Sequence, residues 1–454
     1  MKALIGLLTM AGLCCAQNVT VIQNGIIHTV TKGTFTGSIV IRDGKIAEVG
    51  EKVMTPGGAK IVDATGKHVM PGIIDAHTHI ALDSINEGSI SVSSMVDIGQ
   101  MLNPESKSIY QALAGGVTTA NTMHGSANSI GGQNVVFKMR WGNNADGLVF
   151  KEAKPSLKMA LGENVKRSGN PQGGGFQMQG TQNLRYPGTR MGVEDVIRDA
   201  YTRAREYQKE IKEYEAKKAK GEVALPPKRD LQLEPLVEVL EGKRIVHAHC
   251  YRSDEILMLL RVFDDFGIKG VVFQHVLEGY KVAKEIAAGG HSASTFSDWW
   301  NYKIEAADAI PYNAAIMQKK GVLVSLNSDD AGGAELGRRL NTEAAKVMKY
   351  GGLTEEEAIA MITINPARQM QIDKWVGSIE TGKDADIVIY DKNPLSMYSK
   401  VEKVFIEGKQ YFDRDSDVTA RPKTEAKKNG LIQKEKETEK RNMPQTMPQT
   451  RRPS

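Results

Sequence analysis

Two histidines placed two residues apart offer the clearest chemistry in this chain. His77 and His79 lie in the segment PGIIDAHTHI, whose isoleucines indicate a buried strand. Side chains two apart on a strand point to the same face, so both imidazoles can reach one divalent cation. Asp75 is in register with them and could hold one imidazole by a hydrogen bond. The spacing predicts a metal site, although a chance pair on a core strand has the same spacing.

Further metal-ligand residues follow other strand-like segments. They stand in RIVHAHC, GVVFQHV and GVLVSLNSD, and are His247, His249, His275 and Asp329. Any one of them alone would be read as an ordinary core or surface polar group. Barrel enzymes recruit catalytic groups from the carboxyl ends of their strands. The repeated placement therefore favours one shared metal site.

The segments around these residues alternate between strands and helices. VTTANTM and SLKMALG have strand patterns, whereas SDEILMLLRVFDDF has a helical one. This alternation predicts an α/β fold with a parallel sheet, and residues 71–367 suit a (β/α)8 TIM-like barrel. An insertion at about 164–243 contains a charged helix, which is either solvated or a cap over the active site.

The two ends of the chain have a different character. Residues 17–70 and 368–414 contain short β-branched strands with turn signals such as Asn-Gly and Asp-Gly. Each piece is too small alone, so we expect them to form one small β-sandwich domain together. Residues 415–454 carry few apolar side chains and are expected to be a disordered charged tail.

The first sixteen residues, MKALIGLLTMAGLCCA, predict a signal peptide. Lys2 is followed by a short apolar stretch and by small residues that suit cleavage after Ala16; an uncleaved anchor is the alternative. We expect a secreted or periplasmic protein with no membrane span after cleavage. Cys250 would then be the only cysteine left, which excludes a disulfide framework.

The net charge of +5 does not indicate a nucleic-acid partner. Residues 421–454 hold ten Lys or Arg and four Asp or Glu, so the rest of the chain is close to neutral. A nucleic-acid footprint needs basic residues gathered on the folded surface. We therefore expect no nucleic-acid partner.

Two other segments contain candidate substrate-binding residues. The Gly-, Asn- and Ser-rich segment 122–134 is expected to be a loop that offers His124, Asn128 and Gln133 to a polar substrate. In FSDWWNYKIEA, Trp299 and Trp300 are typical of packing between barrel and helix. Tyr302 and Lys303 are expected to polarise or anchor a substrate carbonyl or carboxylate.

The motifs together resemble the amidohydrolase superfamily, in its imidazolonepropionase-like or dipeptidase-like branch. PGIIDAHTHI, GGVTT, VHAH, QHVLEGYKVA, SLNSDDAG, TINPARQM and GKDADIV follow the family order from about residue 19 to 413. The resemblance implies that His77 and His79 hold the more buried metal and that His247 and His275 hold the second. It also implies that Asp329 contacts metal and shuttles a proton, with His249 near the substrate.

The resemblance leaves the fourth-strand ligand open. Many members bridge two metals there with a carboxylated lysine, and others use a glutamate. Lys158 in SLKMALG matches the lysine version, and Glu163 is the alternative. Five residues apart, they cannot both face inward on one regular strand. Lys158 is favoured, because a buried unpaired lysine would be costly.

The implied activity is that of a secreted metal-dependent hydrolase. One or two divalent ions, zinc first among them, would generate a hydroxide that attacks an amide, cyclic amide or small dipeptide at its C–N bond. Asp329 would act as general base and then acid. An esterase or lactonase on the same site is the first alternative, and a non-catalytic metal-binding or interaction protein is the second. The resemblance also allows a homo-oligomer.

Overall fold

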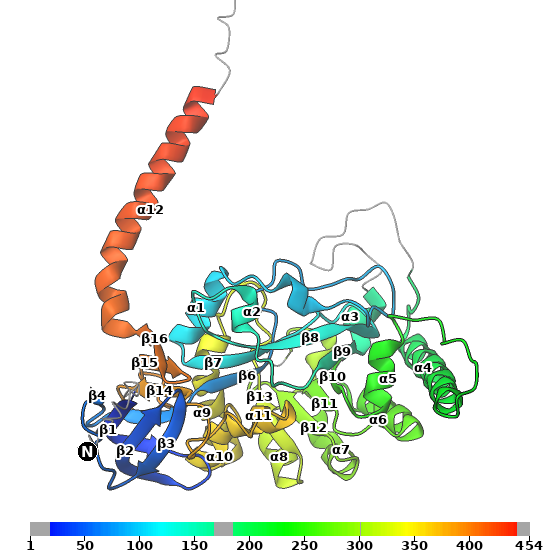
Figure 1. Cartoon of the computed structure of the whole chain (residues 1–454), viewed down its shortest axis with the longest axis horizontal. Helices are drawn as coiled ribbons and strands as arrows, with labels where there is room; N and C mark the ends of the chain where they lie inside the picture. Colours follow the sequence, from blue (N-terminus) through cyan, green and yellow to red (C-terminus); the bar gives the residue numbers. More distant parts are fainter. Residues whose placement is uncertain (1–18, 168–184, 300, 443–454) are drawn as a thin grey trace, which may run out of the picture.

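The chain folds around two β-sheets, one from its middle and one from its two ends (Figure 1). This computed structural model describes residues 19–167, 185–299 and 301–442. The expected signal peptide, residues 1–16, lies outside the described residues. No helix in the described part of the chain is both long and apolar enough to cross a bilayer.

The middle sheet has eight strands that lie side by side in chain order. Their side chains are buried almost throughout, although β7 and β12 consist largely of small and polar residues. The strands are β6 (Ile73–Thr78), β7 (Val117–Thr122), β8 (Ile130–Lys138), β9 (Ser156–Ala160), β10 (Ile245–Cys250), β11 (Val272–His275), β12 (Ser292–Thr295) and β13 (Leu323–Leu326). The predicted α/β class is confirmed.

The two edges of this sheet meet, so that it is nearly closed into a barrel. Beyond β13, Asp329 N donates to His77 O at 3.0 Å, and His79 N donates to Asp330 O at 2.7 Å. These bonds join the carboxyl end of β6 to the loop after β13. The predicted TIM-like barrel is therefore confirmed, and its closure already brings two candidate ligands together.

One strand departs from the all-parallel arrangement of a (β/α)8 barrel. β8 runs antiparallel to both β7 and β9. Only residues 123–129 separate β7 from β8, and a parallel crossover needs about a dozen residues or more. The prediction of a loop at 122–134 is thus wrong for residues 130–134, which begin β8. Their glycine and amide residues are typical of loops, so the sequence pattern did not indicate a strand.

Helices follow most barrel strands and lie on the outside of the sheet (Figure 1). In α6, buried Ile256, Leu259 and Phe263 recur at helical spacing, and Gly267 ends the helix in the left-handed conformation at φ 70°. The helices are α1 (Lys107–Ala114), α2 (Ala145–Leu148), α3 (Gly162–Arg167), α4 (Arg190–Ala219), α5 (Glu234–Leu240), α6 (Ser253–Phe266), α7 (Ala283–Ala288), α8 (Asn313–Lys319), α9 (Leu340–Gly351), α10 (Glu355–Ala360) and α11 (Ile364–Gln369), with 3-10 turns η1 (Ile98–Met101), η2 (Gly279–Lys281), η3 (Ile304–Ala306) and η4 (Gly337–Arg339).

The charged helix expected in the insertion is α4. Its first half buries Val193, Ile197 and Tyr201, whereas most side chains after Tyr207 are exposed. It packs beside α5 and α6, so it flanks the barrel wall. Residues 168–184 of the insertion lie outside the described residues.

Both chain ends contribute to the second sheet, as predicted. β5 pairs antiparallel with β14 and parallel with β1, which also pairs with β2 and β4. Hydrogen bonding thus makes one branched sheet around its own apolar core. Its strands are β1 (Val19–His28), β2 (Thr34–Arg42), β3 (Lys45–Gly50), β4 (Lys60–Asp63), β5 (His68–Pro71), β14 (Ile387–Tyr390), β15 (Val401–Ile406) and β16 (Lys409–Asp413).

A fully buried lysine joins the barrel to this β domain. Lys138 Nζ on β8 lies 2.6 Å from Asp384, 3.1 Å from Asp386 and 3.1 Å from Glu407. Burial lowers the pKa of Lys138, but the three carboxylates outweigh burial and raise it above its ordinary value. The ammonium is therefore held charged at the domain boundary.

Replacing this lysine is expected to destabilise the protein strongly. Lys138→Met would leave buried carboxylates without their cation, and the free energy of unfolding should fall by about 3–5 kcal/mol. Lys45→Met is the matched control, because Lys45 also pairs with Asp384 but its side chain is 50% exposed. Its loss should stay below about 1 kcal/mol. Urea unfolding measures both, and equal losses would contradict the prediction.

A second histidine pair lies in the β domain. His28 Nε2 is 2.8 Å from His68 Nδ1, and His28 Nδ1 is 3.5 Å from Glu355 Oε1 on α10. Burial lowers the pKa of His28 from 6.5 to about 4, although Glu355 partly opposes this. The folded chain thus takes up a proton at His28 only at lower pH than the unfolded chain.

Acidification is therefore expected to destabilise the fold by protonating His28. Its stabilising contribution is complete above pH 6.5 and is lost as the pH falls from 6.5 to about 4, by up to about 3 kcal/mol. Thermal unfolding at pH 7.5 and pH 5 should show a smaller acid-induced loss for His28→Gln than for the unchanged chain. Equal losses in both proteins would rule out a role for His28.

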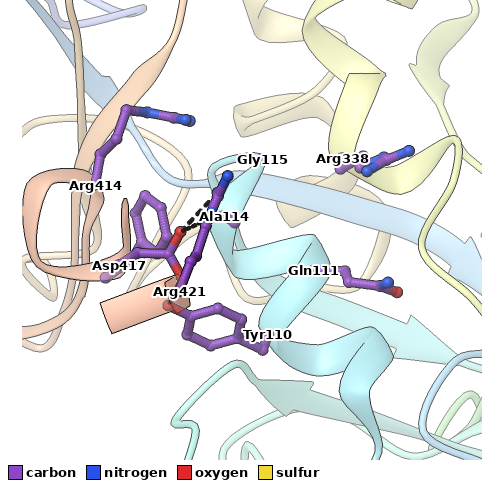
Figure 2. A pocket seen from close by; sticks show the side chains of 9 residues that line it. Tyr110, Gln111, Ala114, Gly115, Arg338, Arg414, Asp417 and Arg421 are labelled. Atoms are coloured by element: carbon purple, nitrogen blue, oxygen red, sulfur yellow. Dashed lines mark hydrogen bonds and ion pairs between the residues drawn. The ribbon is translucent and has the colours of Figure 1, made fainter. Parts of the chain in front are cut away.

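The tail prediction is wrong for residues 415–442, which belong to helix α12 (Arg414–Asn442). Its Lys, Glu, Arg and Ala residues lack a core but have high helix propensity. The first turns are anchored where Tyr110 Oη donates to Asp417 at 2.9 Å and Arg421 pairs with Asp417 at 2.7 Å (Figure 2). This anchor borders a hollow of about 330 Å³ whose lining contains no histidine. Beyond it, α12 projects away from the body (Figure 1).

Candidate metal centre

The predicted ligands come from the carboxyl ends of the barrel strands. Parallel pairing places Lys158 on β9 beside His247 on β10, and Cys250 on β10 beside His275 on β11. His77 stands one residue before the end of β6, and Asp329 lies in the loop after β13. Because parallel strands end at one face of a barrel, residues distant in sequence meet there.

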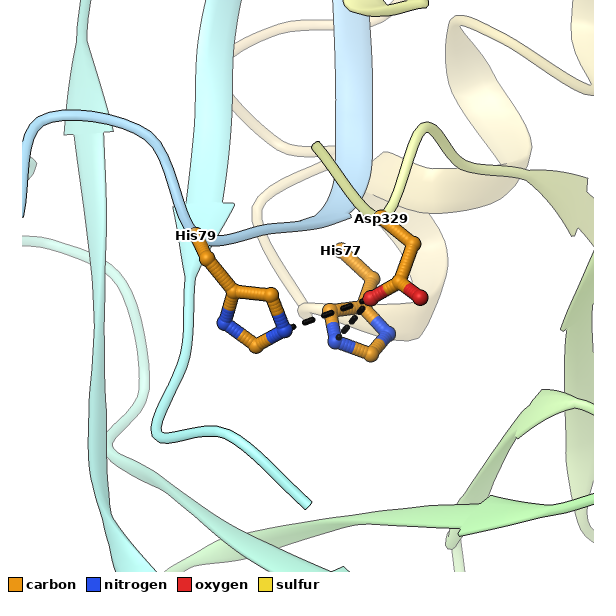
Figure 3. Close-up of side chains that lie close together, drawn as sticks. All are labelled: His77, His79 and Asp329. Atoms are coloured by element: carbon orange, nitrogen blue, oxygen red, sulfur yellow. Dashed lines mark ion pairs between the residues drawn. The ribbon is translucent and has the colours of Figure 1, made fainter. Parts of the chain in front are cut away.

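Three side chains form the centre of this cluster (Figure 3). Asp329 Oδ1 lies 3.2 Å from His79 Nε2 and 3.4 Å from His77 Nε2. One ligand atom from each of these residues lies within 4.8 Å of the others. Two imidazole nitrogens and a carboxylate oxygen are the donors that zinc and similar ions take in proteins.

The remaining ring nitrogen of His79 is fixed by the backbone. His79 Nδ1 lies 2.8 Å from Met123 O, so the ring donates there and presents its Nε2 lone pair to Asp329 and the cluster. A carbonyl that orients a ligating histidine in this way is common around metals. The cluster therefore contains a preformed ligand as well as suitable residue types.

His275 provides an independent test of whether the residues fit a metal. It is 0% exposed, and neither ring nitrogen has a hydrogen-bond partner within the described residues. Its Nε2 lies 4.0 Å from Asp329 Oδ2, and its ring lies 4.8 Å from that of His77. A buried imidazole without a partner is costly unless something binds it. The donor set thus fits a divalent ion.

The backbone around the centre is strained at two of these residues. His275 has φ 69° and Asp329 has φ 52°, in the left-handed region that non-glycine residues rarely adopt. Such positions persist only where the surroundings enforce them, and they gather at functional sites. Here the strain turns both side chains into the cluster.

Lys158 and Glu163 are placed differently. Lys158 Nζ is fully buried and lies 2.8 Å from His77 Nε2, inside the cluster. Glu163 lies in α3, beyond the end of β9, where its backbone N–H donates to Glu305 at 2.7 Å. The structure therefore brings Lys158 to the predicted ligands, as the strand context suggested.

Asp75 has another role than the one expected. Its carboxylate accepts bonds from Ser328 N at 3.1 Å, from Ser328 Oγ at 2.5 Å and from His77 N at 3.3 Å, not from an imidazole. Burial raises the pKa of Asp75 to about 7, although these bonds oppose it. Asp75 thus fixes the backbone next to Asp329.

His249 lies beside the cluster. Its Nδ1 is 2.9 Å from Ser126 Oγ, its Nε2 has no partner among the described residues, and its ring is 4.6 Å from that of His275. The Tyr251 ring stacks on His275 at 5.4 Å. The rings of His249 and Tyr251 therefore form one wall of the site.

Tyr302 and Lys303 lie on the outer side of this wall. Tyr302 Oη donates to Tyr251 Oη at 2.7 Å, and Lys303 Nζ lies 4.0 Å above the Tyr251 ring. Lys303 also contacts Asn164 at 3.2 Å. Both side chains thus stand at the approach to the cluster. Trp299 packs on Phe296, and Trp300 lies outside the described residues.

The other three candidate substrate contacts are not brought to the cluster. His124 uses both ring nitrogens, on Glu87 N and Gly125 O, each at 2.8 Å. Asn128 donates to the carbonyls of Glu87 and Ile90, and Gln133 donates to Ser94 O. All three side chains thus help to hold the segment 85–97 against the barrel.

Electrostatics at the site keep the imidazoles of His247 and His275 neutral and Asp329 ionised. Burial lowers the pKa of His247 and of His275 to about 3, and that of Lys158 to about 7. Burial alone would raise the pKa of Asp329, but His275, His79 and Lys158 hold it below its ordinary value. Neutral imidazole and carboxylate are the forms that bind metal.

Three residues of the site were not found by sequence reasoning. Gln274 joins His77 to His247, Ser328 joins Asp75 to the Asp329 backbone, and Tyr251 forms the wall. Each directly adjoins a predicted residue or lies two positions from one, as in QH, SD and HCY. The only sequence signal for these residues was that each lies next to, or two positions from, a predicted ligand. Their residue types alone do not distinguish them from ordinary core residues.

Comparison with known proteins shows which family the sequence matches. The sequence profile of the amidohydrolase family matches residues 68–411. The amidohydrolase tasK of Hapsidospora irregularis is 29% identical over 87% of this chain, and the match spans only 42% of that protein. An imidazolonepropionase of Geobacillus sp. (strain WCH70) is 25% identical over 85% of this chain and 89% of its own length.

A solved structure is similar over the same range. A crystal structure of an amidohydrolase from Thermotoga maritima MSB8 is 33% identical, with a TM-score of 0.78. The match covers 87% of this chain and 100% of that chain. The barrel and the β domain built from both ends therefore have a counterpart of the same arrangement.

Proposed function

The chain belongs to the amidohydrolase family, and from that premise we propose that it hydrolyses a C–N bond in a small amide, cyclic amide or dipeptide. The observation that carries this proposal is the convergence of His77, His79 and Asp329, whose ligand atoms lie within 4.8 Å of one another. One or two divalent ions, zinc first among them, are the cofactors that this donor set suits.

The ions would be held by buried histidines, a buried lysine and the partly exposed Asp329. His77, His79 and Asp329 would hold one ion, and His247 and His275 the second, with Lys158 between them as a carboxylated bridge. A divalent ion supplies acidity to water near neutral pH and polarises a carbonyl oxygen. The unpartnered nitrogens of His275 support this assignment.

Asp329 would move the proton. Its carboxylate is held ionised and its side chain is 25% exposed, so it can face both the cluster and a substrate. It would accept a proton from the attacking water and pass it to the leaving nitrogen. Without that proton, an amine is a poor leaving group and the C–N bond reforms.

The wall of the site would orient the substrate. His249 Nε2 is buried and has no partner in the described part of the chain, so it can bond to a substrate carbonyl. Tyr302 and Lys303 stand further out, where they would contact a polar or carboxylate group of a dipeptide. We also propose export through residues 1–16, which N-terminal sequencing of secreted protein would test.

A substrate panel with metal analysis tests the proposal. The purified chain should contain zinc or a similar ion and hydrolyse at least one amide or dipeptide. Activity should disappear on chelation and return when the metal is restored. Turnover of lactones or esters alone would favour the esterase reading. Full metal loading without turnover on any of these substrates would favour a binding protein.

A further inference from the structure

A short segment of the insertion, residues 185–190, contacts loops at the mouth of the barrel, where the carboxyl ends of the strands meet. The segment leads into α4, whose start is fixed because Thr189 Oγ1 accepts from Gly192 N at 3.1 Å. Pro187 is buried, and the first half of α4 packs beside α5 and α6. The segment therefore has a firm base, and it carries an arginine at each of its ends.

Arg185 joins three parts of the chain at this mouth. Its guanidinium donates to the carbonyls of Gly88 and Ile90, in the segment that follows β6. It also donates to Ala127 O at 2.6 Å, in the loop after β7, and to Val165 O at 3.5 Å, in α3 after β9. A guanidinium is planar and has donors in several fixed directions, so it can hold several carbonyls at once. Arg185 thus fixes these parts relative to one another.

Arg190 joins two further loops by charge. Its Nη2 donates to Glu305 Oε1 at 2.7 Å, in η3 after β12, and its Nε lies 3.1 Å from Glu255 Oε1, in α6 after β10. The Glu255 and Glu305 side chains are only 4% and 1% exposed. Buried carboxylates that lose their cation are costly. The two ion pairs therefore hold both loops against the start of α4.

Through Ala127, the Arg185 contacts reach His249. Ala127 follows Ser126, whose Oγ lies 2.9 Å from His249 Nδ1, so the loop that Arg185 holds also sets the direction of the His249 ring. The other nitrogen of His249 is buried, has no partner among the described residues and is the one proposed to bond a substrate carbonyl. Movement of this loop would displace that nitrogen.

Through Glu305, the Arg190 contacts reach Lys303. Lys303 Nζ lies 3.6 Å from Glu305 Oε2 and 4.0 Å from the Tyr251 ring, while Arg190 holds the other oxygen of Glu305. The backbone N–H of Glu163 donates to that same oxygen at 2.7 Å. Without Arg190, the Glu305 carboxylate would lose its closest cation, and Lys303 would move from the Tyr251 ring toward it.

We propose that Arg185 and Arg190 are positioning residues, and that residues 185–190 form a clasp that assembles the substrate-binding face from five separate parts of the barrel mouth. Arg185 acts through Ser126 on His249, and Arg190 acts through Glu305 on Lys303. The clasp gives the insertion a direct part in the site. The inference rests on the proposed function for the identity of the substrate contacts, but the ties themselves are independent of any activity.

Hydrogen exchange measured by mass spectrometry tests the clasp in the full chain, without substrate. Arg185→Met should speed exchange about 10-fold or more in residues 85–97 and 123–129, but not in η3 or at the start of α6. Arg190→Met should have the opposite pattern, with faster exchange in η3 and at the start of α6 only. Faster exchange in the same loops for both variants, or no change in either, would overturn the proposal.

Arg244→Met is the matched control. Arg244 is also an arginine that donates to a backbone carbonyl, that of Ser156 at 3.1 Å, but it lies at the amino end of β9 and β10, and its side chain is 8% exposed. Its replacement should leave exchange at the mouth unchanged. A change at the mouth as large as that in Arg185→Met would show that any lost arginine loosens these loops, and would contradict the clasp.

Lysine variants cover the case in which a methionine variant does not fold. Arg190→Lys keeps the positive charge but has a single ammonium in place of the two guanidinium nitrogens that contact Glu255 and Glu305. Either η3 or the start of α6 should then lose protection while the other keeps it. Full protection of both in Arg190→Lys would show that charge alone suffices, and would overturn the bridging role.

Steady-state kinetics separates positioning from a purely structural role. On an amide or dipeptide that the chain hydrolyses, Arg190→Met should raise KM about 10-fold and change kcat less than about 3-fold, because Lys303 contacts substrate whereas proton transfer depends on Asp329. A loss confined to kcat would overturn the positioning role. A chain without turnover on any substrate would contradict the proposed function but not the exchange results, and unaltered exchange in an active chain would contradict only the clasp.

Discussion

Replacing Asp329 with asparagine is expected to lower kcat by about 10²- to 10⁴-fold while the fold and metal content are retained. Asparagine fills the same space and keeps one oxygen near His77 and His79, which lie 3.4 Å and 3.2 Å from Asp329 Oδ1. An amide cannot accept the proton of the attacking water, so the chemical step fails. Rates on a substrate from the panel, together with metal analysis and circular dichroism, measure the three quantities.

The neighbouring aspartate offers a matched control. Asp330→Asn makes the same chemical change one residue along, where the carboxylate accepts bonds from Leu336 N and Gly337 N. Most turnover should remain in this variant. Near-normal turnover in Asp329→Asn would remove Asp329 from the proposed proton transfer. Loss of metal together with activity would assign it a ligand role alone.

Much of the fold could be predicted from local patterns. The barrel followed from apolar strands alternating with helices, because buried parallel strands leave a continuous hydrophobic signal. β8 was not predicted, because Gly131, Gly132 and the polar residues beside them are typical of a loop. Glycine is needed there, because a Cβ on either residue would meet the His124 ring. That requirement lies in the tertiary structure and leaves no local pattern.

In the C-terminal segment 415–442, sequence composition predicted exposure correctly but missed the helix. Low hydrophobicity predicts that residues 415–442 form no core, and every side chain described there is exposed except that of Asp417. It does not exclude a helix, because helix propensity depends on backbone and side-chain entropy rather than on burial. The anchor through Asp417 and Tyr110 joins residues some 300 positions apart, and such a contact cannot be read from either segment alone.

The candidate metal ligands could be predicted because few residue types bind metal. The residues that hold these ligands in place by hydrogen bonds could not be predicted. Few residue types hold zinc, so His77 and His275 were conspicuous in their strands. Gln274 and Ser328 act through hydrogen bonds that almost any polar residue can form. His124 illustrates the reverse error: a histidine near the site fits a substrate contact by type, but its ring is occupied by loop backbone.

Replacing Lys158 with alanine is expected to reduce the bound metal from two ions to one. Lys158 is fully buried beside His77, and burial lowers its pKa to about 7, so a large share of the amine is neutral near neutral pH. A neutral amine adds CO₂ and releases one proton, which gives a carbamate with two oxygens for two ions. Without that bridge, the His247 and His275 side has only neutral ligands to hold a dication. Elemental analysis per mole of protein measures the change.

Glu163→Gln is the matched control for the other candidate bridge. It removes one negative charge beside Glu305, away from the His77 contact, and should leave two ions bound. If instead Lys158→Ala keeps both ions and Glu163→Gln loses one, the bridge is the glutamate. ¹³C NMR after incubation with labelled bicarbonate separates the cases directly, since only a carboxylated lysine yields a carbamate signal that Lys158→Ala abolishes.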